Sequence, residues 1–204
     1  MTPATHSTTL DQWLADESLA RQRQDAGPGA GVSTLAQIGS KNGLQTLQAM
    51  LQGELPYAPI FDTLDFLLIR VAAGEAVFQG TPGLQHGNPL GTVHGGWFAT
   101  LLDSALGCAV HTLMPSGRGY TTTQLNVNLV KALTPKVTRV RAEGKVIHCG
   151  RQLATAEARL VGPDGTLYAH ATTTCLVFDL PNFTRENHDL SAHHAARRPP
   201  ATRD

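Results

Sequence analysis

The chain has 204 residues, a length that fits one ordinary domain with additions at its ends. Hydrophobic residues make up 41% and charged residues 16%, which is enough apolar material for a core and is not typical of disordered or collagen-like chains. Sixteen Lys plus Arg balance sixteen Asp plus Glu, so the formal net charge is +0. The chain therefore lacks the bulk positive charge with which nucleic-acid-binding proteins attract polyanions.

The cysteines and the N-terminal residues bear on the compartment. Cys108, Cys149 and Cys175 form no CxxC pair and have apolar neighbours, which predicts reduced core thiols. The N-terminus has no basic segment followed by an apolar one, and no stretch approaches the roughly 20 apolar residues that span a bilayer. We expect a soluble, cytoplasmic protein that does not bind membranes.

Both ends differ in composition from the middle of the chain. Residues 1–40 are predicted to form a loosely attached leader, partly helical or disordered, with a helix over Leu10–Gln24 that a Gly/Pro-rich segment ends. Residues 181–204 carry almost no large apolar side chains and are predicted to be a disordered tail. Its histidines have no fixed geometry, so we expect no functional metal site there; they are His188, His193 and His194.

The remaining residues, 41–180, are predicted to form one α+β domain. An antiparallel sheet would wrap around one long helix, Gly95–Met114, whose apolar stripe faces the core. That stripe consists of Phe98, Leu101, Leu102, Ala105, Ala109 and Thr112. The other predicted elements are a helix over Asn42–Gln52 and strands over Leu64–Val71, Glu75–Gln79, Thr121–Leu129, Val137–His148, Leu153–Leu160 and Leu167–Phe178.

The glycine-rich segment before the long helix is the first candidate site. It runs from Asn88 through His94 to Gly95 and Gly96. Glycines at a helix start allow close approach of a ligand, and the free N–H groups there carry the positive end of the helix dipole. Such a place can stabilise a carbonyl oxygen as it becomes an oxyanion. The alternative is a glycine turn whose histidine only packs or caps the helix.

Asp103 is the second candidate, because aspartate is a poor residue for a helix interior. Small residues on its side of the helix would let another surface approach. Eight residues separate it from Gly95, about 12 Å along the axis, which is too far for both to act on one carbonyl. If they cooperate, a two-fold dimer with antiparallel helices would bring them together. The alternative is an aspartate that faces solvent.

The strand after the helix alternates apolar and polar residues. Its polar face, with Thr122, Gln124 and Asn126, could orient a water molecule near Asp103, although Thr-rich sequence is also typical of an ordinary strand. The chain contains no GxSxG, P-loop, HExxH or dinucleotide-binding GxGxxG pattern. This argues against serine hydrolases, NTPases, zinc proteases and dinucleotide-binding enzymes, and we expect no cofactor.

The residues now described resemble the hotdog-fold acyl-CoA thioesterases of the phenylacetate-degradation (PaaI) type. The resemblance covers roughly residues 55–177. It is carried by the Asn-x-x-Gly-x-x-His-Gly-Gly run at 88–96, by Leu101-Leu102-Asp103-Ser104-Ala105, by Leu55-Pro56-Tyr57-Ala58-Pro59-Ile60 and by Gly150-Arg151. The order of the predicted elements agrees with the hotdog fold.

The resemblance implies a role for each matching residue. Asp103 would be the general base or the nucleophile, Gly95 would donate its N–H to the thioester carbonyl, and Thr122 would help to hold water. Asn88 and His94 would line the site. The substrate-binding residues would be Gly96, Gly150 and Arg151, with the arginine near the coenzyme A phosphates. For Arg151 the alternative is a solvated turn residue.

The sequence thus predicts an acyl-CoA thioesterase that hydrolyses an acyl- or aryl-CoA thioester to the free acid and coenzyme A without metal or cofactor. The resemblance implies sites between subunits, with a homodimer as the minimal active unit and a homotetramer expected. A non-catalytic acyl-CoA-binding module is the alternative. Asp103 favours the enzyme, because a binding module needs no carboxylate aimed at the thioester.

Overall fold

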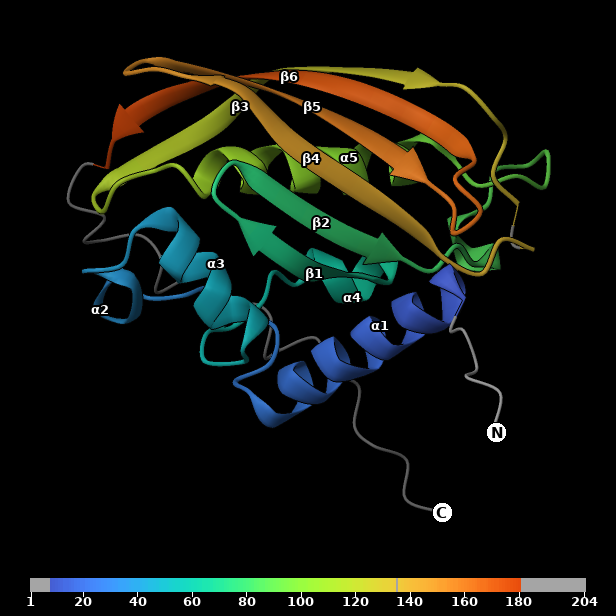
Figure 1. Ribbon diagram of the computed structural model, residues 1–204, viewed down its shortest axis with the longest axis horizontal. Helices are drawn as coiled ribbons and strands as arrows, with labels where there is room; N and C mark the ends of the chain where they lie inside the picture. Colours follow the sequence, from blue (N-terminus) through green and yellow to red (C-terminus); the bar gives the residue numbers. More distant parts are fainter. Residues whose placement is uncertain (1–7, 135, 181–204) are drawn as a thin grey trace, which may run out of the picture.

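The computed structural model describes residues 8–134 and 136–180. A six-stranded antiparallel sheet, in the order β1-β2-β4-β5-β6-β3, curves around the helix α5 (Figure 1). The strands are β1 (Phe66–Ala72), β2 (Glu75–Gly80), β3 (Arg118–Leu129), β4 (Val140–Cys149), β5 (Leu153–Val161) and β6 (Leu167–Asp179). The helices are α1 (Thr9–Ala26), α2 (Leu35–Ile38), α3 (Gly43–Leu51), α4 (Ile60–Leu64), the 3-10 turn η1 (Leu84–His86) and α5 (Gly95–His111).

The central helix has the predicted apolar face. All six residues of the predicted stripe are buried, none more than 5% exposed. The helix ends at His111 instead of Met114, because the Leu113 N–H bonds to the Val110 carbonyl and tightens the last turn. The predicted α+β class, with an antiparallel sheet around one long central helix, is confirmed.

The sheet meets α5 through very small residues. Ala154, Ala156 and Ala158 of β5 are buried against the helix side of the sheet. A Cβ atom at Gly144 of β4 would lie 2.3 Å from the Ala105 carbonyl oxygen. The helix backbone therefore rests almost directly on β4, and no ligand fits between them.

A bulge in β3 changes the predicted faces of this strand. Thr122 pairs with Cys175 and Gln124 with Thr174, so Thr123 is an extra residue. The extra residue moves Thr122 to the helix side, together with the half-buried Leu125 and Val127. Gln124 and Asn126 lie on the opposite, exposed face. The prediction that these two amides share a face with Thr122 near Asp103 is wrong, since simple alternation fails across a bulge.

The N-terminal helix is firmly attached. α1 runs along the outside of β1 and β2 (Figure 1) and buries Trp13, Glu17 and Ala20. Gln79 of β2 faces α1, is 0% exposed, and donates from Nε2 to the Trp13 carbonyl and to Glu17 Oε2. The expectation that the helix at this end is loosely attached is therefore wrong. The tail at 181–204 lies outside the described residues.

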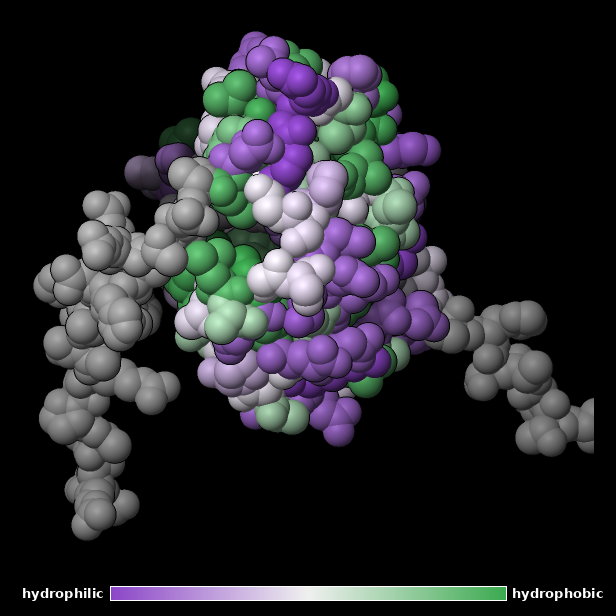
Figure 2. All heavy atoms as spheres, turned by 90° about the vertical axis from the view of Figure 1, so that its left-hand side faces the viewer, coloured by the Kyte–Doolittle hydropathy of each residue, from purple (hydrophilic) through white to green (hydrophobic). Residues whose placement is uncertain are grey.

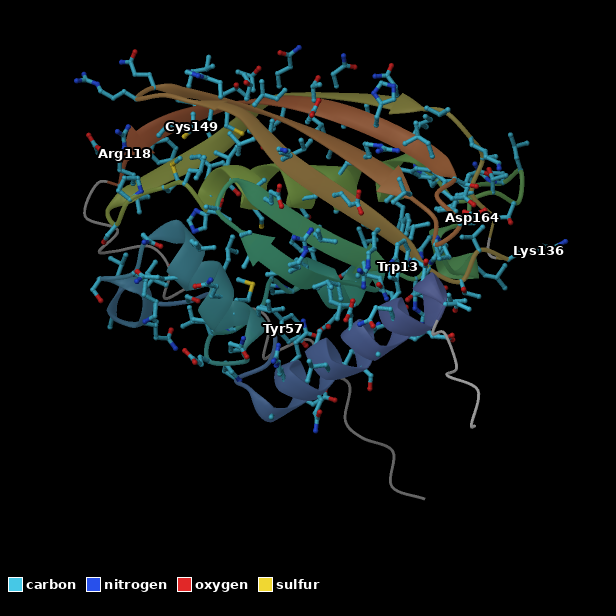
Figure 3. The ribbon with its side chains drawn as sticks, viewed as in Figure 1. Trp13, Tyr57, Arg118, Lys136, Cys149 and Asp164 are labelled. Atoms are coloured by element: carbon cyan, nitrogen blue, oxygen red, sulfur yellow. The ribbon has the colours of Figure 1, made fainter. Side chains whose placement is uncertain are left out.

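Charged residues fix α1 to the sheet. Glu17 is 5% exposed and accepts hydrogen bonds from Arg139 and Arg21. Burial alone would raise the pKa of Glu17, but these hydrogen bonds outweigh it and the pKa is lowered. The Arg141 guanidinium lies 4.6 Å from the ring centroid of Trp13, a residue labelled in Figure 3. The same guanidinium donates a hydrogen bond to Asp16 at 2.7 Å.

In residues 8–134 and 136–180, no helix is both long and apolar enough to cross a membrane. The three cysteines are free; Cys175 is buried, and Cys108 and Cys149 are half-buried.

Replacing Glu17 with Gln should lower the free energy of unfolding by about 2 kcal/mol at pH 7, because Arg139 loses its buried partner. A lowered folded-state pKa means that the stabilisation is present above the unfolded pKa and disappears as the pH falls through the folded-state value. Urea unfolding at pH 7 and below pH 4 measures both effects. Glu54→Gln, at an exposed position, is the matched control; equal losses in the two variants would contradict the prediction.

Candidate active site

The loop before α5 is built by Asn88. Its Oδ1 accepts from the Leu90 N–H at 2.9 Å and the Thr92 N–H at 3.3 Å, while its Nδ2 donates to Thr92 Oγ1 at 2.8 Å. Gly91 has a φ of 82°, which glycine adopts without strain. The Asn88 side chain is thus occupied within the loop. Its predicted place in the lining of a substrate site stays a prediction.

His94 caps α5. Its backbone is extended, with φ −66° and ψ 138°, and its Nδ1 accepts the Gly96 N–H at 2.9 Å. The proton of the neutral ring is then on Nε2. The structure therefore agrees with the alternative in which this histidine caps the helix. The Gly96 N–H is occupied by the hydrogen bond to Nδ1.

The N–H of Gly95 remains available at the helix start. Among the described residues no acceptor bonds to it, and as the first helical residue it shares the positive end of the dipole. A Cβ atom here would lie 2.9 Å from Leu129 Cδ1, so the start of α5 adjoins the end of β3. This N–H has the chemistry of an oxyanion donor.

Sequence reasoning missed His86, which supports this loop. The residue is 5% exposed, its Nδ1 accepts the Gly83 N–H at 3.1 Å, and its carbonyl accepts the His94 N–H at 2.8 Å. Its ring stacks on Trp97 at 5.4 Å, and burial lowers its pKa, with a partial offset from Asp65. No sequence pattern indicates the role of His86, because it depends on how the loop closes over Trp97.

Asp103 faces β3 and is half-buried. Its Oδ1 accepts from Thr122 Oγ1 at 3.1 Å, and in the described part of the chain its Oδ2 has no hydrogen-bond partner. Burial, with a smaller contribution from the charge of Asp103, raises the pKa of the Cys108 thiol to about 12. The alternative of a purely solvent-facing aspartate is therefore wrong. Thr122 binds one carboxylate oxygen, and the other has no partner in the described part of the chain.

The turn after β4 lies apart from these residues. The Gly150 N–H bonds to the Leu153 carbonyl at 2.8 Å, and the exposed Arg151 offers its carbonyl to the Arg118 guanidinium. Cys149 and Arg118 lie at the same end of the molecule in Figure 3. Figure 2, which faces this end, shows hydrophobic residues interspersed among hydrophilic ones. Sequence reasoning missed Arg118, because only the sheet brings the start of β3 next to this turn.

The predicted site residues thus form three groups in one chain. His94, Gly95 and Gly96 lie together at the start of α5, with Asn88 in the loop before it. Asp103 and Thr122 form a pair at mid-helix. Gly150 and Arg151 follow Cys149 at the end of β4. Cys149 lies three strand spacings from Thr122, or roughly 14 Å, along the row of paired residues Thr122, Cys175, Ala154 and Cys149.

No cluster of three or more His, Cys, Asp or Glu side chains that could hold a metal ion occurs within the described ranges. The tail histidines fall outside those ranges.

Comparison with known proteins identifies the family. Residues 90–169, which contain α5, β3, β4 and β5, match the family described as "Thioesterase superfamily". This part of the chain is similar to the thioesterase superfamily. Its sheet and central helix form the hotdog fold of that family, as the resemblance of the sequence predicted.

Individual known proteins are similar to parts of the chain. A Halobacterium salinarum protein named "Putative esterase" is 34% identical over 87 residues, which are 43% of this chain and 57% of that protein's length. The phenylacetic acid degradation-related protein of Ralstonia eutropha JMP134 is 27% identical with a TM-score of 0.58, covering 63% of this chain and 97% of its own. For a variant of the phenylacetic acid degradation protein PaaI of Thermus thermophilus the identity is 28%, the TM-score 0.53, and the coverage 58% and 97%.

Two substitutions separate the capping role of His94 from any contact with a ligand. His94→Ala removes the acceptor of the Gly96 N–H and should lower the free energy of unfolding by about 1 kcal/mol. His94→Asn restores a good capping acceptor without the imidazole, so the stability should return. If hydrolytic activity also returns in the Asn variant, capping is the whole role of His94; if only stability returns, the imidazole contacts the substrate. Thermal unfolding and initial rates measure the two effects.

Proposed function

We propose that the protein is an acyl-CoA thioesterase that hydrolyses an acyl- or aryl-CoA thioester to the free acid and coenzyme A. The observation that carries this proposal is the Asp103 carboxylate, held at one oxygen by Thr122 and, within residues 8–134 and 136–180, unpartnered at the other. The unbonded Gly95 N–H supports it, because thioester hydrolysis needs a donor for the developing oxyanion.

These groups support two routes of thioester hydrolysis. The Gly95 N–H donates to the thioester oxygen, which gains negative charge as the carbonyl carbon is attacked. In one route Asp103 Oδ2 takes a proton from water while the water oxygen attacks; in the other Oδ2 attacks directly and water later hydrolyses the acyl-aspartate. In both routes the C–S bond breaks and coenzyme A leaves as a thiolate, which then takes up a proton.

We place each site across a homodimer. β3 is an edge strand of the sheet, so one side of its backbone has no strand beside it among residues 8–134 and 136–180. α5 runs along β3 with Gly95 beside Leu129 and Asp103 beside Thr122, nearer the other end of the strand. Two β3 edges paired antiparallel about a two-fold axis would set the two α5 helices antiparallel as well. Gly95 of one chain would then approach Asp103 of the other.

The coenzyme A phosphates are assigned to the turn at Gly150 and Arg151. An exposed Arg151 side chain suits phosphate oxygens, and Arg118 fixes the turn by donating to the Arg151 carbonyl. A tetramer of two such dimers and a cytoplasmic location, which three free cysteines fit, complete the proposal.

Asp103→Asn tests the proposed activity. The variant keeps the side-chain volume but loses the base or nucleophile, so thiol release should fall about 1,000-fold with an unchanged melting temperature. The assay is thiol release from short-, medium- and long-chain and aryl acyl-CoAs. Glu157→Gln, an exposed carboxylate on the outer face of β5, is the control and should keep full activity. Tight acyl-CoA binding without turnover in the wild type would instead favour the non-catalytic binding module.

A mixing experiment tests the shared site. Gly95→Pro removes the candidate donor at a first helical position, where the N–H has no acceptor among the described residues and His94 is already extended. The added ring would meet Leu129 Cδ1, which belongs to an exposed side chain that can move aside. Gly95→Pro and Asp103→Asn should each be inactive alone. After unfolding and refolding together, half of the dimers are mixed and each has one intact site, so about a quarter of the wild-type activity should return. No recovery in mixed dimers would place both groups of a site in one chain.

A further inference from the structure

A glycine interrupts the buried part of α5 one turn after Asp103. Gly107 is buried in the helix interior, where glycine is the poorest residue except proline. A Cβ atom at this position would lie 2.8 Å from Tyr120 Oη and 3.1 Å from Tyr120 Cε2. The tyrosine ring therefore occupies the space that a side chain at 107 would need.

Tyr120 and Thr122 reach α5 from the same face of β3. They pair with Val177 and Cys175 of β6, both of which are buried on the helix side. Thr122 meets Asp103, and Tyr120 meets Gly107 one turn further along the helix. The Tyr120 ring also lies 5.7 Å from that of His111, another turn on. Two residues on the same face of β3 thus contact two positions of α5 that are four residues apart.

We propose that the Gly107–Tyr120 contact is a positioning device that sets how closely α5 approaches β3 and so holds Asp103 within hydrogen-bond distance of Thr122. This inference rests on the proposed thioesterase activity. A methyl group at 107 would separate the helix from the strand at the turn next to Asp103. The hydrogen bond between Thr122 and Asp103 is already 3.1 Å long, so a shift of a few tenths of an ångström weakens it. Gly107 and Tyr120 do not touch substrate in this scheme.

The test adds a methyl group at position 107 and then removes the Tyr120 hydroxyl that this methyl group would contact. Gly107→Ala should lower kcat about 10- to 100-fold with KM nearly unchanged, because misplacement by a fraction of an ångström affects the reaction more than binding. Adding Tyr120→Phe removes the nearest atom, Oη, and should restore kcat about tenfold relative to Gly107→Ala alone. A purely structural role for Gly107 would lower the amount of folded enzyme and leave the kcat of the folded fraction unchanged.

Gly119→Ala is the matched control. Gly119 is buried next to Tyr120 in β3, but its added Cβ would lie 2.7 Å from Leu180 Cδ2 and 3.2 Å from Phe178 Cε2, away from α5. This variant should lose stability and keep kcat. An equal fall in kcat at both glycines, or no rescue by Tyr120→Phe, overturns the proposal.

Two further results separate the possible failures. If Gly107→Ala does not fold, Tyr120→Leu is measured alone, because it removes the ring against which Gly107 packs: a lower kcat with an unchanged KM supports the proposal, and an unchanged kcat overturns it. Wild-type protein without thioesterase activity would refute the proposed function. An active wild type with an unaffected Gly107→Ala variant refutes only the positioning role.

Discussion

The contact between α5 and the sheet constrains the rest of the molecule. Gly144 lets the helix backbone rest against β4, and the alanines of β5 continue that close approach. At β4 and β5 the helix lies too close to the sheet for a substrate to fit between the two layers. The proposed chemistry is therefore assigned to the start of α5 and to the half-buried side of the helix beside the edge strand β3. Gly95 lies at the first of these places and Asp103 at the second.

The edge strand connects the fold to the proposed chemistry. β3 meets α5 near Gly95, at Asp103 and at Gly107, so its register along the helix decides where each functional group lies. The bulge at Thr123 is essential to that register, because without the extra residue Thr122 would face away from Asp103. In the proposed dimer, the outer side of the same strand pairs with the β3 of a second copy.

The N-terminal helix α1 lies outside the segment that matches the superfamily and is attached to the sheet by its own contacts. α1 precedes residues 90–169 and covers the outer side of β1 and β2, where Glu17 and Gln79 are buried polar groups that satisfy each other. Sequence patterns predicted the helix but not its attachment. The buried side of α1 combines Trp13, Glu17 and Ala20, and such a mixed face shows no apolar stripe in the sequence. Its partners Arg139 and Arg141 lie more than a hundred residues away.

The sequence by itself determined the six strands, the longer helices, the α+β class, the buried stripe of α5 and the similarity to thioesterases, but not the short elements α2, α4 and η1. Local periodicity and a motif at fixed spacing carry that information. Only the tertiary structure decided that His94 caps the helix, that Asn88 folds its loop and that Asp103 meets Thr122, with Gln124 and Asn126 on the other face. The physical reason is that hydrogen bonds between distant elements depend on register, and one extra residue in a strand reverses the direction of every side chain beyond it.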